Sequence, residues 1–420
     1  MMRRKLRAHT LVLALTISLI ITALTASLTW LYSMQLKMYD ETLINLKLSK
    51  NIDSGFNLVI ANDLQMRIDD PFYATSLFGG TDDSVLLKRS TWGLYDLVAC
   101  KAWFKNQLMY RSALYGYLMN EKPFAMYAAD NGVILNLCGN SSLIGDCYLP
   151  KADLKAGIID KVGFKGNSLI KGSKYSSTPY LPPIDSQLYD LNHSYMLMAL
   201  NAKDGFTNVT SLQEDSFVNS FFTKPSLIKV KNNSILSQVS IKGQVIVMCP
   251  GTLHIANSAY LEDVLIYAEK IVIKSGFKGS LQAFATSQII IEPNVYLQYP
   301  SALYLSPVNL TSERSNILLQ KNATVEGLIF CDSRGDEMSD VFINDYARMK
   351  GVVYVNGRTM IDGTIEGSLI SKLLTVKASS GTYDNFIFNG KINRDALSEH
   401  FTNSPFVKLS SSTGIVKWLY

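Results

Sequence analysis

Charged side chains are scarce in this chain. Asp, Glu, Lys and Arg make up 18% of its 420 residues, whereas hydrophobic residues make up 47%. This composition excludes an intrinsically disordered polymer, which combines high charge with low hydrophobicity. The net charge is only +5, and four of the positive charges lie within the first seven residues. Because little basic surface remains elsewhere, nucleic acid is not an expected partner.

Cysteine and histidine are also few, with five cysteines and four histidines in the chain. No Cys-x-x-Cys pair is present, so neither a zinc knuckle nor a thioredoxin-like site is expected. Cys138 and Cys147 are close enough in sequence to form a disulfide in an oxidising compartment; the simpler alternative is that both are small buried strand residues. Metal-ligand spacing is absent among the histidines, which are His9, His193, His254 and His400.

The common catalytic motifs are missing as well. No Gly-x-Ser-x-Gly, His-Glu-x-x-His, phosphate loop or dinucleotide fingerprint occurs. We therefore predict no catalytic residue, no cofactor-binding residue, no metal ligand and no cofactor, and we expect the chain not to be an enzyme.

One dense acidic stretch runs from Asp332 through Asp336 and Glu337 to Asp340, with Asp345 beyond it. A polysaccharide-cleaving enzyme would need paired carboxylates or calcium ligands of this kind. Because the stretch is a single glycine-containing loop, its carboxylates are expected to face water instead. Replacing Asp332, Asp336 and Asp340 together should then leave the fold intact.

What the chain does have is a long hydrophobic run near its N-terminus. Arg3, Arg4, Lys5 and Arg7 precede an uncharged segment over 8–32. About 20 apolar residues suffice to cross a bilayer, and the basic cluster predicts an N-terminus in the cytoplasm. The alternative, a cleaved signal peptide, has a shorter apolar region and a clearer small-residue cleavage site. The sequence favours a retained anchor in the inner membrane.

An amphipathic helix is predicted over 33–70, directly after the membrane segment. Apolar residues recur at helical intervals, and no proline interrupts the pattern before Pro71. The apolar face should pack on the following domain, or else on a partner helix. The residues of that predicted face are Leu36, Tyr39, Leu43, Leu46, Phe56 and Ile60.

An internal repeat of about 18 residues extends from Leu253 to Ser306. Its register places Ile255, Ile273 and Ile291 in one column, with turn residues such as Ser275-Gly276 between the short strands. A single coil cannot cover its apolar side, but stacked coils share one core. The repeat therefore predicts a β-solenoid in which Ile273 faces inward and Lys274 outward.

Shorter repeats extend the predicted solenoid in both directions. Thr324-Val-Glu-Gly and Thr364-Ile-Glu-Gly share a pattern, so Glu326 and Glu366 are expected to have a structural role. Gly-punctuated strands also occur near 142–150 and 164–172. We predict a solenoid over 125–390, interrupted over 185–222 by a partly helical insertion that either covers the solenoid or extends from it.

The predicted fold class is mainly β, with an N-terminal transmembrane helix, an amphipathic helix and a right-handed parallel β-helix. The expected segments are a cytoplasmic tail (1–7), a transmembrane helix (8–32), an amphipathic helix (33–70), an α/β connecting region (71–124), the solenoid (125–390) and a C-terminal cap (391–420).

Several segments resemble known families. Trp92-Gly-Leu-Tyr-Asp96 and Cys147-Tyr-Leu-Pro-Lys151 resemble motifs of an uncharacterised single-pass envelope protein family of Bacteroidetes, over about 180 residues. The order of membrane helix, amphipathic helix and β-rich body resembles that of pilins and pseudopilins, without their processing motif. The short coils resemble bactofilin-like polymer-forming domains. These resemblances imply a location and a shape, and they imply no active site.

The expected function is a membrane-anchored periplasmic scaffold or assembly component of the bacterial envelope, beside a pilus-like or secretion apparatus. Its expected partners are the inner membrane and other envelope proteins. The alternative is a membrane-tethered enzyme or binding protein for polysaccharide. Exposed aromatic residues along a coil face with two or more carboxylates would favour that alternative.

Overall fold

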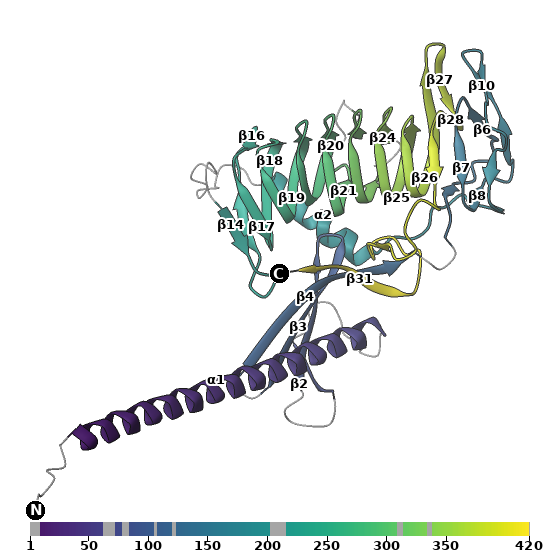
Figure 1. Cartoon of the computed structure of the whole chain (residues 1–420). Coiled ribbons are helices and arrows are strands. Elements are labelled where there is room, and N and C mark those ends of the chain that lie inside the picture. Colours follow the sequence, from purple (N-terminus) through teal and green to yellow (C-terminus); the bar gives the residue numbers. More distant parts are fainter. Residues whose placement is uncertain are drawn as a thin grey trace, which may run out of the picture. The chain divides into compact units, whose positions relative to one another are not determined.

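The computed structural model describes residues 9–61, 72–77, 84–104, 107–119, 123–201, 216–308, 314–333 and 338–419 (Figure 1). The chain forms two compact units. The first contains Met1–Val59, Tyr73–Leu87 and Cys100–Tyr110, and the second contains Ile60–Phe72, Lys88–Ala99 and Arg111–Tyr420. The predicted cytoplasmic tail lies outside the described residues.

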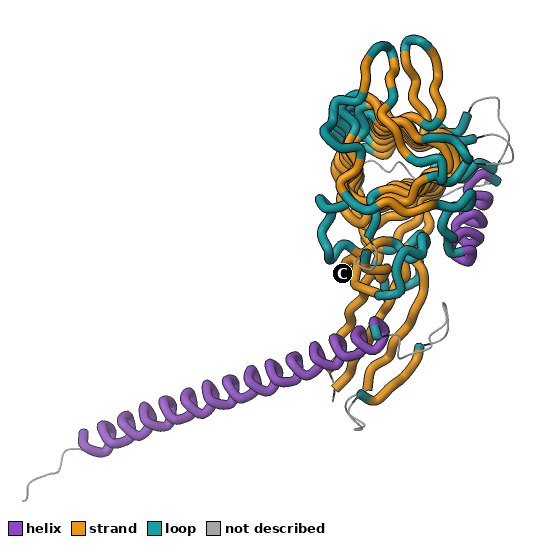
Figure 2. Tube along the Cα trace, turned by 90° about the vertical axis from the view of Figure 1, so that its right-hand side faces the viewer, coloured by secondary structure: helices purple, strands orange, loops and turns teal. Residues whose placement is uncertain are grey.

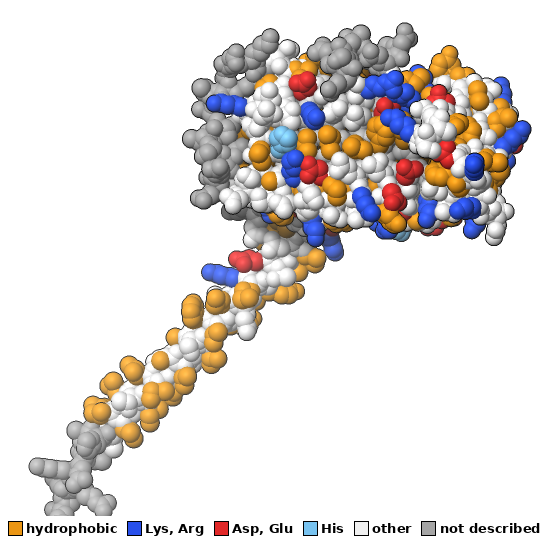
Figure 3. Space-filling model, turned by 90° about the horizontal axis from the view of Figure 1, so that it is seen from above, with side chains coloured by type: hydrophobic (Ala, Val, Ile, Leu, Met, Phe, Trp, Pro, Cys, Tyr) orange, Lys and Arg blue, Asp and Glu red, His pale blue; other side chains and the backbone are white. Residues whose placement is uncertain are grey.

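Helix α1 is a single uninterrupted helix of 52 residues, His9–Ile60. Its first half carries large hydrophobic side chains that are exposed on every side, and Figure 3 shows those on the face in view. The helix is long and apolar enough to cross a membrane, which fits either an anchor or a signal sequence. The prediction of one helix through both segments is confirmed as far as Ile60. Residues 62–70 of the predicted amphipathic helix lie outside the described part.

The buried face of α1 differs from the predicted one. Leu48, Ile52 and Phe56 are buried, and Gly55 lies against Cys100 and Leu87 of the first unit's strands. The predicted positions Leu36, Tyr39, Leu43 and Leu46 are exposed instead. Only Phe56 of the predicted face is fully buried. Packing on the chain's own domain is therefore wrong for the segment nearest the membrane half, and the alternative of a partner helix stays a prediction.

An antiparallel sheet follows the helix, and its longest strands are divided between the two units. The prediction of α/β structure over 71–124 is wrong for the described residues, which form strands and turns only. The strands of this sheet are β1 (Tyr73–Ser76), β2 (Ser84–Trp92), β3 (Tyr95–Phe104), β4 (Gln107–Leu118), β30 (Thr402–Asn403) and β31 (Thr413–Leu419).

Twenty of the described strands form one continuous, largely parallel sheet wound into a solenoid, whose wall is seen end-on in Figure 2. They are β5 (Met126–Ala128), β7 (Ser142–Ile144), β8 (Cys147–Leu149), β12 (Ile170–Lys171), β13 (Lys174–Ser176), β14 (Ser216–Asn219), β15 (Ser226–Lys229), β16 (Ser234–Leu236), β17 (Ser240–Gly243), β18 (Val245–Ile255), β19 (Tyr260–Ile273), β20 (Lys278–Ile291), β21 (Tyr296–Leu305), β22 (Asn316–Leu319), β23 (Thr324–Cys331), β24 (Asp340–Ile343), β25 (Arg348–Ile361), β26 (Thr364–Ala378), β27 (Gly381–Asp384) and β29 (Lys391–Asn393).

Smaller strands complete the β structure at one end of the solenoid. A three-stranded sheet consists of β28, β6 and β9, and β10 pairs with β11. Their bounds are β6 (Leu135–Cys138), β9 (Leu154–Ala156), β10 (Ile158–Ile159), β11 (Val162–Gly163) and β28 (Phe386–Phe388).

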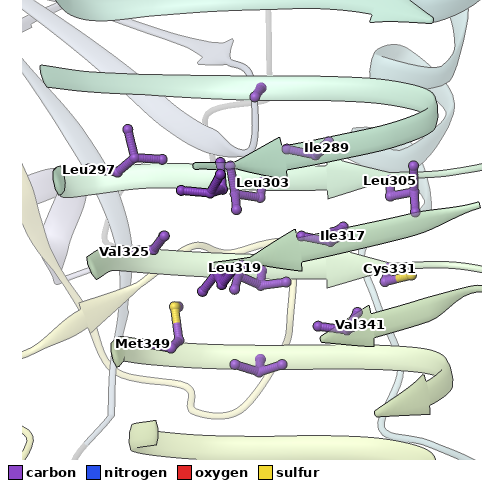
Figure 4. Close-up of a cluster of buried hydrophobic side chains, with 14 of the residues drawn as sticks. Ile289, Leu297, Leu303, Leu305, Ile317, Leu319, Val325, Cys331, Val341 and Met349 are labelled. Carbon is purple, nitrogen blue, oxygen red and sulfur yellow. The ribbon is translucent and has the colours of Figure 1, made fainter. Parts of the chain in front are cut away.

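Aliphatic columns fill the solenoid, as the repeat predicts. Ile255 pairs in register with Ile273, which pairs with Ile291. All three side chains are fully buried, so Ile273 faces the core as expected. The column continues on later coils through Leu319, Ile343 and Ile361. Figure 4 shows the same arrangement for residues such as Ile289, Ile317 and Val341.

The coils do not stack in the order of the chain. β5 and β7, which come early in the sequence, pair with β26 and β29 near its C-terminal end. The opposite end of the solenoid begins with β14, β15 and β16. A solenoid that ran straight through 125–390 is therefore wrong in order, although the strands expected near 142–150 and 164–172 are present.

Helix α2 (Ser186–Leu200) lies between the two sets of coils in sequence. Asp185 caps its N-terminus by accepting a hydrogen bond from the Leu188 amide at 3.0 Å. Leu188, Met196 and Ala199 are buried with the outward side chains of β18, β19 and β20. The insertion is thus partly helical and covers the solenoid; it ends by Ser216, where β14 begins. β29 also extends the solenoid into the predicted C-terminal cap.

A column of glycines lets three coils approach closely. Gly327, Gly351 and Gly367 are register partners with φ between +133° and +143°. A Cβ atom on Gly367 would overlap the carbonyl oxygen of Gly351, and one on Gly351 would overlap that of Gly327. The repeated Thr-x-Glu-Gly motif therefore exists because both backbone conformation and space require glycine there.

Replacing Gly367 with alanine should destabilise the solenoid far more than the same change at Gly381. Gly381 has a similar φ of +144°, but no atom lies within 4 Å of the place that a Cβ would occupy. Gly381→Ala should cost about 1–3 kcal/mol of backbone strain, whereas Gly367→Ala must also separate two coils. Denaturant unfolding of the purified variants measures both losses of unfolding free energy. Equal losses would show that the close approach of the coils at Gly367 does not contribute to stability.

Candidate functional site

The acidic stretch singled out in the sequence is partly built into the solenoid. Asp340 is buried, and its Oδ1 accepts a hydrogen bond from Arg358 Nε at 2.7 Å. Asp332 accepts hydrogen bonds from Tyr189 Oη at 3.0 Å and from Asn356 Nδ2 at 2.8 Å. The prediction that these two carboxylates face water is wrong, because each holds neighbouring elements together.

The rest of that stretch has no common geometry. Asp336 and Glu337 lie outside the described residues. Asp345 is exposed in the turn before β25. The described residues contain no group of three or more His, Cys, Asp or Glu side chains that could hold a metal ion.

Carboxylates on the outer face of the solenoid are paired with cations from adjacent coils. Glu326, Lys350 and Glu366 occupy successive register positions. Lys350 Nζ lies 3.7 Å from Glu326, and Arg348 Nε lies 3.4 Å from Glu366. The structural role expected for the two glutamates is an ion-pair ladder between coils.

The cysteines are buried thiols. All five are free, and the disulfide considered for Cys138 and Cys147 is not formed. Burial raises the pKa of Cys147 to about 12, which leaves the thiol protonated and unreactive at neutral pH.

Among the histidines, the ring of His193 stacks on the ring of Tyr189, with 5.9 Å between the ring centroids.

A cavity of about 270 Å³ lies in the second unit, where the end of β2 meets α2 and the first coils. Its aromatic walls come from distant parts of the chain and include Trp92, Tyr195, Phe221 and Tyr267. Trp92 and Phe221 pack edge-to-face at 5.5 Å. This volume matches a small ligand or a single sugar ring more closely than a large cofactor.

Hydrogen bonds from buried amides fix the walls of this cavity. Asn192 Nδ2 donates to the Gly93 carbonyl at 3.0 Å, and Tyr267 Oη donates to Asn192 Oδ1 at 2.8 Å. Gln282 Nε2 donates to the Trp92 carbonyl at 2.9 Å, and Trp92 Nε1 donates to the Asp263 carbonyl at 2.8 Å. Complete burial raises the pKa of Tyr267, so its hydroxyl remains a donor.

The electrostatics of the cavity favour a negatively charged group. Lys88 and Lys224 line it, and no carboxylate does among the described residues. Gln244 also lines it, is 7% exposed, and has an Oε1 atom without a hydrogen-bond partner in the described structure. This oxygen can accept a hydrogen bond from a hydroxyl or amide group of a ligand.

Sequence reasoning missed this cavity. Trp92 stands out in the sequence only as part of a resemblance motif, and no motif marks Lys224 or Gln244. The other residues that line the cavity lie on β2, α2 and β19, which are far apart in sequence. No pattern within one segment could have predicted that these residues meet.

Comparison with known proteins adds little. No protein-family model and no curated protein matches the chain. It is similar to a solved structure of the DUF3494 domain of an ice-binding protein from Shewanella frigidimarina, with 12% identity and a TM-score of 0.21. The match covers 67% of this chain and 98% of that domain. A TM-score this low does not establish a shared fold, and the likeness to Bacteroidetes envelope proteins stays a prediction.

Asp340→Asn should destabilise the chain by up to about 3 kcal/mol, because it removes the buried partner of Arg358, whose side chain is only 16% accessible. Glu292→Gln is the matched control. Glu292 accepts from Lys274 at 2.8 Å, but that pair is more exposed, with 26% and 41% of the side chains accessible. Its loss should cost about 0–1 kcal/mol. Chemical denaturation of both variants measures the two losses of unfolding free energy. If Asp340→Asn has no effect on stability, Asp340 belongs to a solvated loop, as the sequence predicts.

Proposed function

We propose that the chain is a single-pass envelope protein of a bacterium, anchored in the inner membrane, whose right-handed β-solenoid acts in the periplasm as a scaffold or assembly component. In this proposal the N-terminus is cytoplasmic and the partners are proteins of a pilus-like or secretion apparatus. The observation that carries it is the exposure of large apolar side chains around the first half of α1, such as Leu11 at 72% and Leu19 at 65%.

The physical reason is that a soluble monomer rarely exposes so large an apolar surface to water. Side chains with half or more of their surface accessible continue along this half of the helix, including Leu15, Leu24 and Leu28. Lipid is the solvent that would cover all sides of a helix equally. The four basic residues before it favour retention of the N-terminus in the cytoplasm.

The ion pairs between the coils of the solenoid support a structural role for its charged side chains. The described carboxylates on its ladder are paired with Lys or Arg side chains. Catalysis of glycoside cleavage would instead need two carboxylates facing one substrate. The outward aromatic column of Tyr267, Phe284 and Tyr304 is buried beneath other elements and is not presented to a polysaccharide.

Two measurements on the full-length protein test the anchor. A C-terminal alkaline phosphatase fusion should be active, and the chain should remain in membranes after alkaline carbonate extraction with its N-terminal residues intact. An inactive fusion would contradict the topology. A shortened chain released from the membrane would identify a cleaved signal peptide instead.

Binding of a saccharide is a second candidate, and the cavity described above favours it. Aromatic walls beside hydroxyl and amide groups suit a sugar ring, while Lys88 and Lys224 suit a carboxylate on that ring. The matching ligand class is an acidic sugar residue, such as a uronic acid. In this candidate function the protein binds the sugar and does not cleave it.

Calorimetric titration with trigalacturonic acid, and with maltotriose as the neutral comparison, tests the second candidate. Only the acidic sugar should bind, and Lys224→Ala should weaken its binding about tenfold through loss of one charge-assisted contact. Lys231→Ala is the control, since Lys231 is exposed and does not line the cavity. Equal binding of both sugars, or none of either, would remove the candidate.

A further inference from the structure

Helix α1 keeps an exposed apolar row beyond the part that is long enough for a membrane. The charged residues Lys37, Asp40 and Glu41 favour a place in water for this part of the helix. Between Leu36 and Leu46, however, five large apolar side chains have about half or more of their surface accessible. One of them, Met38 at 61%, lies apart from the others. The remaining four follow one side of the helix: Leu36 at 47%, Tyr39 at 62%, Leu43 at 46% and Leu46 at 53%. We call these four residues the juxtamembrane seam.

The spacing of the juxtamembrane seam is that of a coiled coil. Its residues follow one another at steps of three, four and three, which are the a and d positions of a heptad. Apart from Met38, the exposed apolar residues between Leu36 and Leu46 lie at a and d only. Such a stripe is narrower than the apolar face of a helix that packs on a globular domain. The pattern therefore predicts that a second helix packs on the juxtamembrane seam, with its axis nearly parallel to that of α1.

The protein's own sheet in the first unit cannot supply that cover. The helix packs on this sheet through Leu48, Ile52 and Phe56. With 3.6 residues per turn, that row lies on the side of the helix opposite the juxtamembrane seam. One side of α1 is therefore covered by its own unit, while the other remains apolar and accessible.

The same heptad series continues into the membrane half with a change of residue type. Ser18, Thr22, Thr25 and Thr29 occupy the preceding a and d positions, and Tyr32 links them to Leu36. Their hydroxyls donate to carbonyls one turn back at 2.9–3.0 Å. Small Ser and Thr side chains allow close helix packing in lipid, whereas Leu and Tyr provide it in water.

We propose that α1 pairs with α1 of a second copy of this chain, parallel and in register, along this continuous series. The proposal rests on the membrane anchor of the proposed function, because copies anchored in one membrane in the same orientation present their seams at the same height. The flanking positions beside the seam are compatible: a parallel pair brings Gln35 near Asp40 and Thr42 near Lys47, and neither contact opposes like charges. At the next a position Lys50 ends the apolar series.

Cysteine cross-linking of the full-length protein in its native membranes tests the pairing. Leu36→Cys should give a covalent dimer on mild oxidation, because a positions face each other across a parallel pair. Glu41→Cys is the matched control, because Glu41 is exposed little more than one turn further along, on the opposite side of the helix. The unmodified chain gives the background, since its five cysteines are all buried.

A second substitution separates pairing from chance collision. Leu43→Asp in the Leu36→Cys background should reduce dimer yield at least fivefold, while Asn45→Asp, off the seam, should leave it unchanged. Equal dimer yields for Leu36→Cys and Glu41→Cys, or no dimer from either, would overturn the proposal. Alkaline extraction of each variant keeps the two claims apart: a chain released from the membrane refutes the anchor, and a retained chain without selective cross-linking refutes the seam.

Discussion

The fold depends on one junction between strands that are far apart in the sequence. β5 and β7 add to the edge formed by β26 and β29, with hydrogen bonds such as that from the Leu369 amide to the Ala125 carbonyl at 2.9 Å. Early coils thereby cover the C-terminal end of the solenoid. Because the next coils start at the other end, the chain must return along the outside, and α2 is part of that return.

This return gives the second unit two cores in place of one. Inward side chains fill the solenoid, as in any stacked coil. Outward aromatics on one face form a second column, in which Tyr267 stacks on Phe284 at 4.5 Å and Tyr304 on Phe330 at 4.8 Å. Helix α2, the β2–β3 turn and the C-terminal segment bury this column. The cavity lies where that cover meets the first coils, so its walls are set by the same arrangement.

Features encoded by local repetition were predictable from the sequence. Ile255, Ile273 and Ile291 form a column because each coil repeats the same inward position. The order of coils was not predictable, because every coil offers similar strands and turns and nothing local selects which end a coil joins. Handedness stays a prediction. The cavity was missed for the related reason that its walls meet only after the chain has returned.

Two errors have instructive physical causes. The helical pattern suggests one face for Leu43 and Phe56, but the thirteen residues between these positions make about 3.6 turns, so the two side chains lie on nearly opposite sides. Asp340 is expected in water because its neighbours in sequence are polar and glycine-rich. Its position opposite Arg358 on the adjacent coil decides its burial, and sequence spacing does not reveal that.

The order of the coils is the central claim, and a pair of engineered disulfides tests it most directly. Tyr127 and Ile370 are register partners on β5 and β26, where neighbouring strands lie about 4.8 Å apart. Tyr127→Cys with Ile370→Cys should therefore cross-link readily in the folded chain. Tyr175→Cys with Leu227→Cys joins β13 to β15, which would be neighbours if the coils stacked in chain order. Efficient cross-linking of the second pair and none of the first would contradict the account.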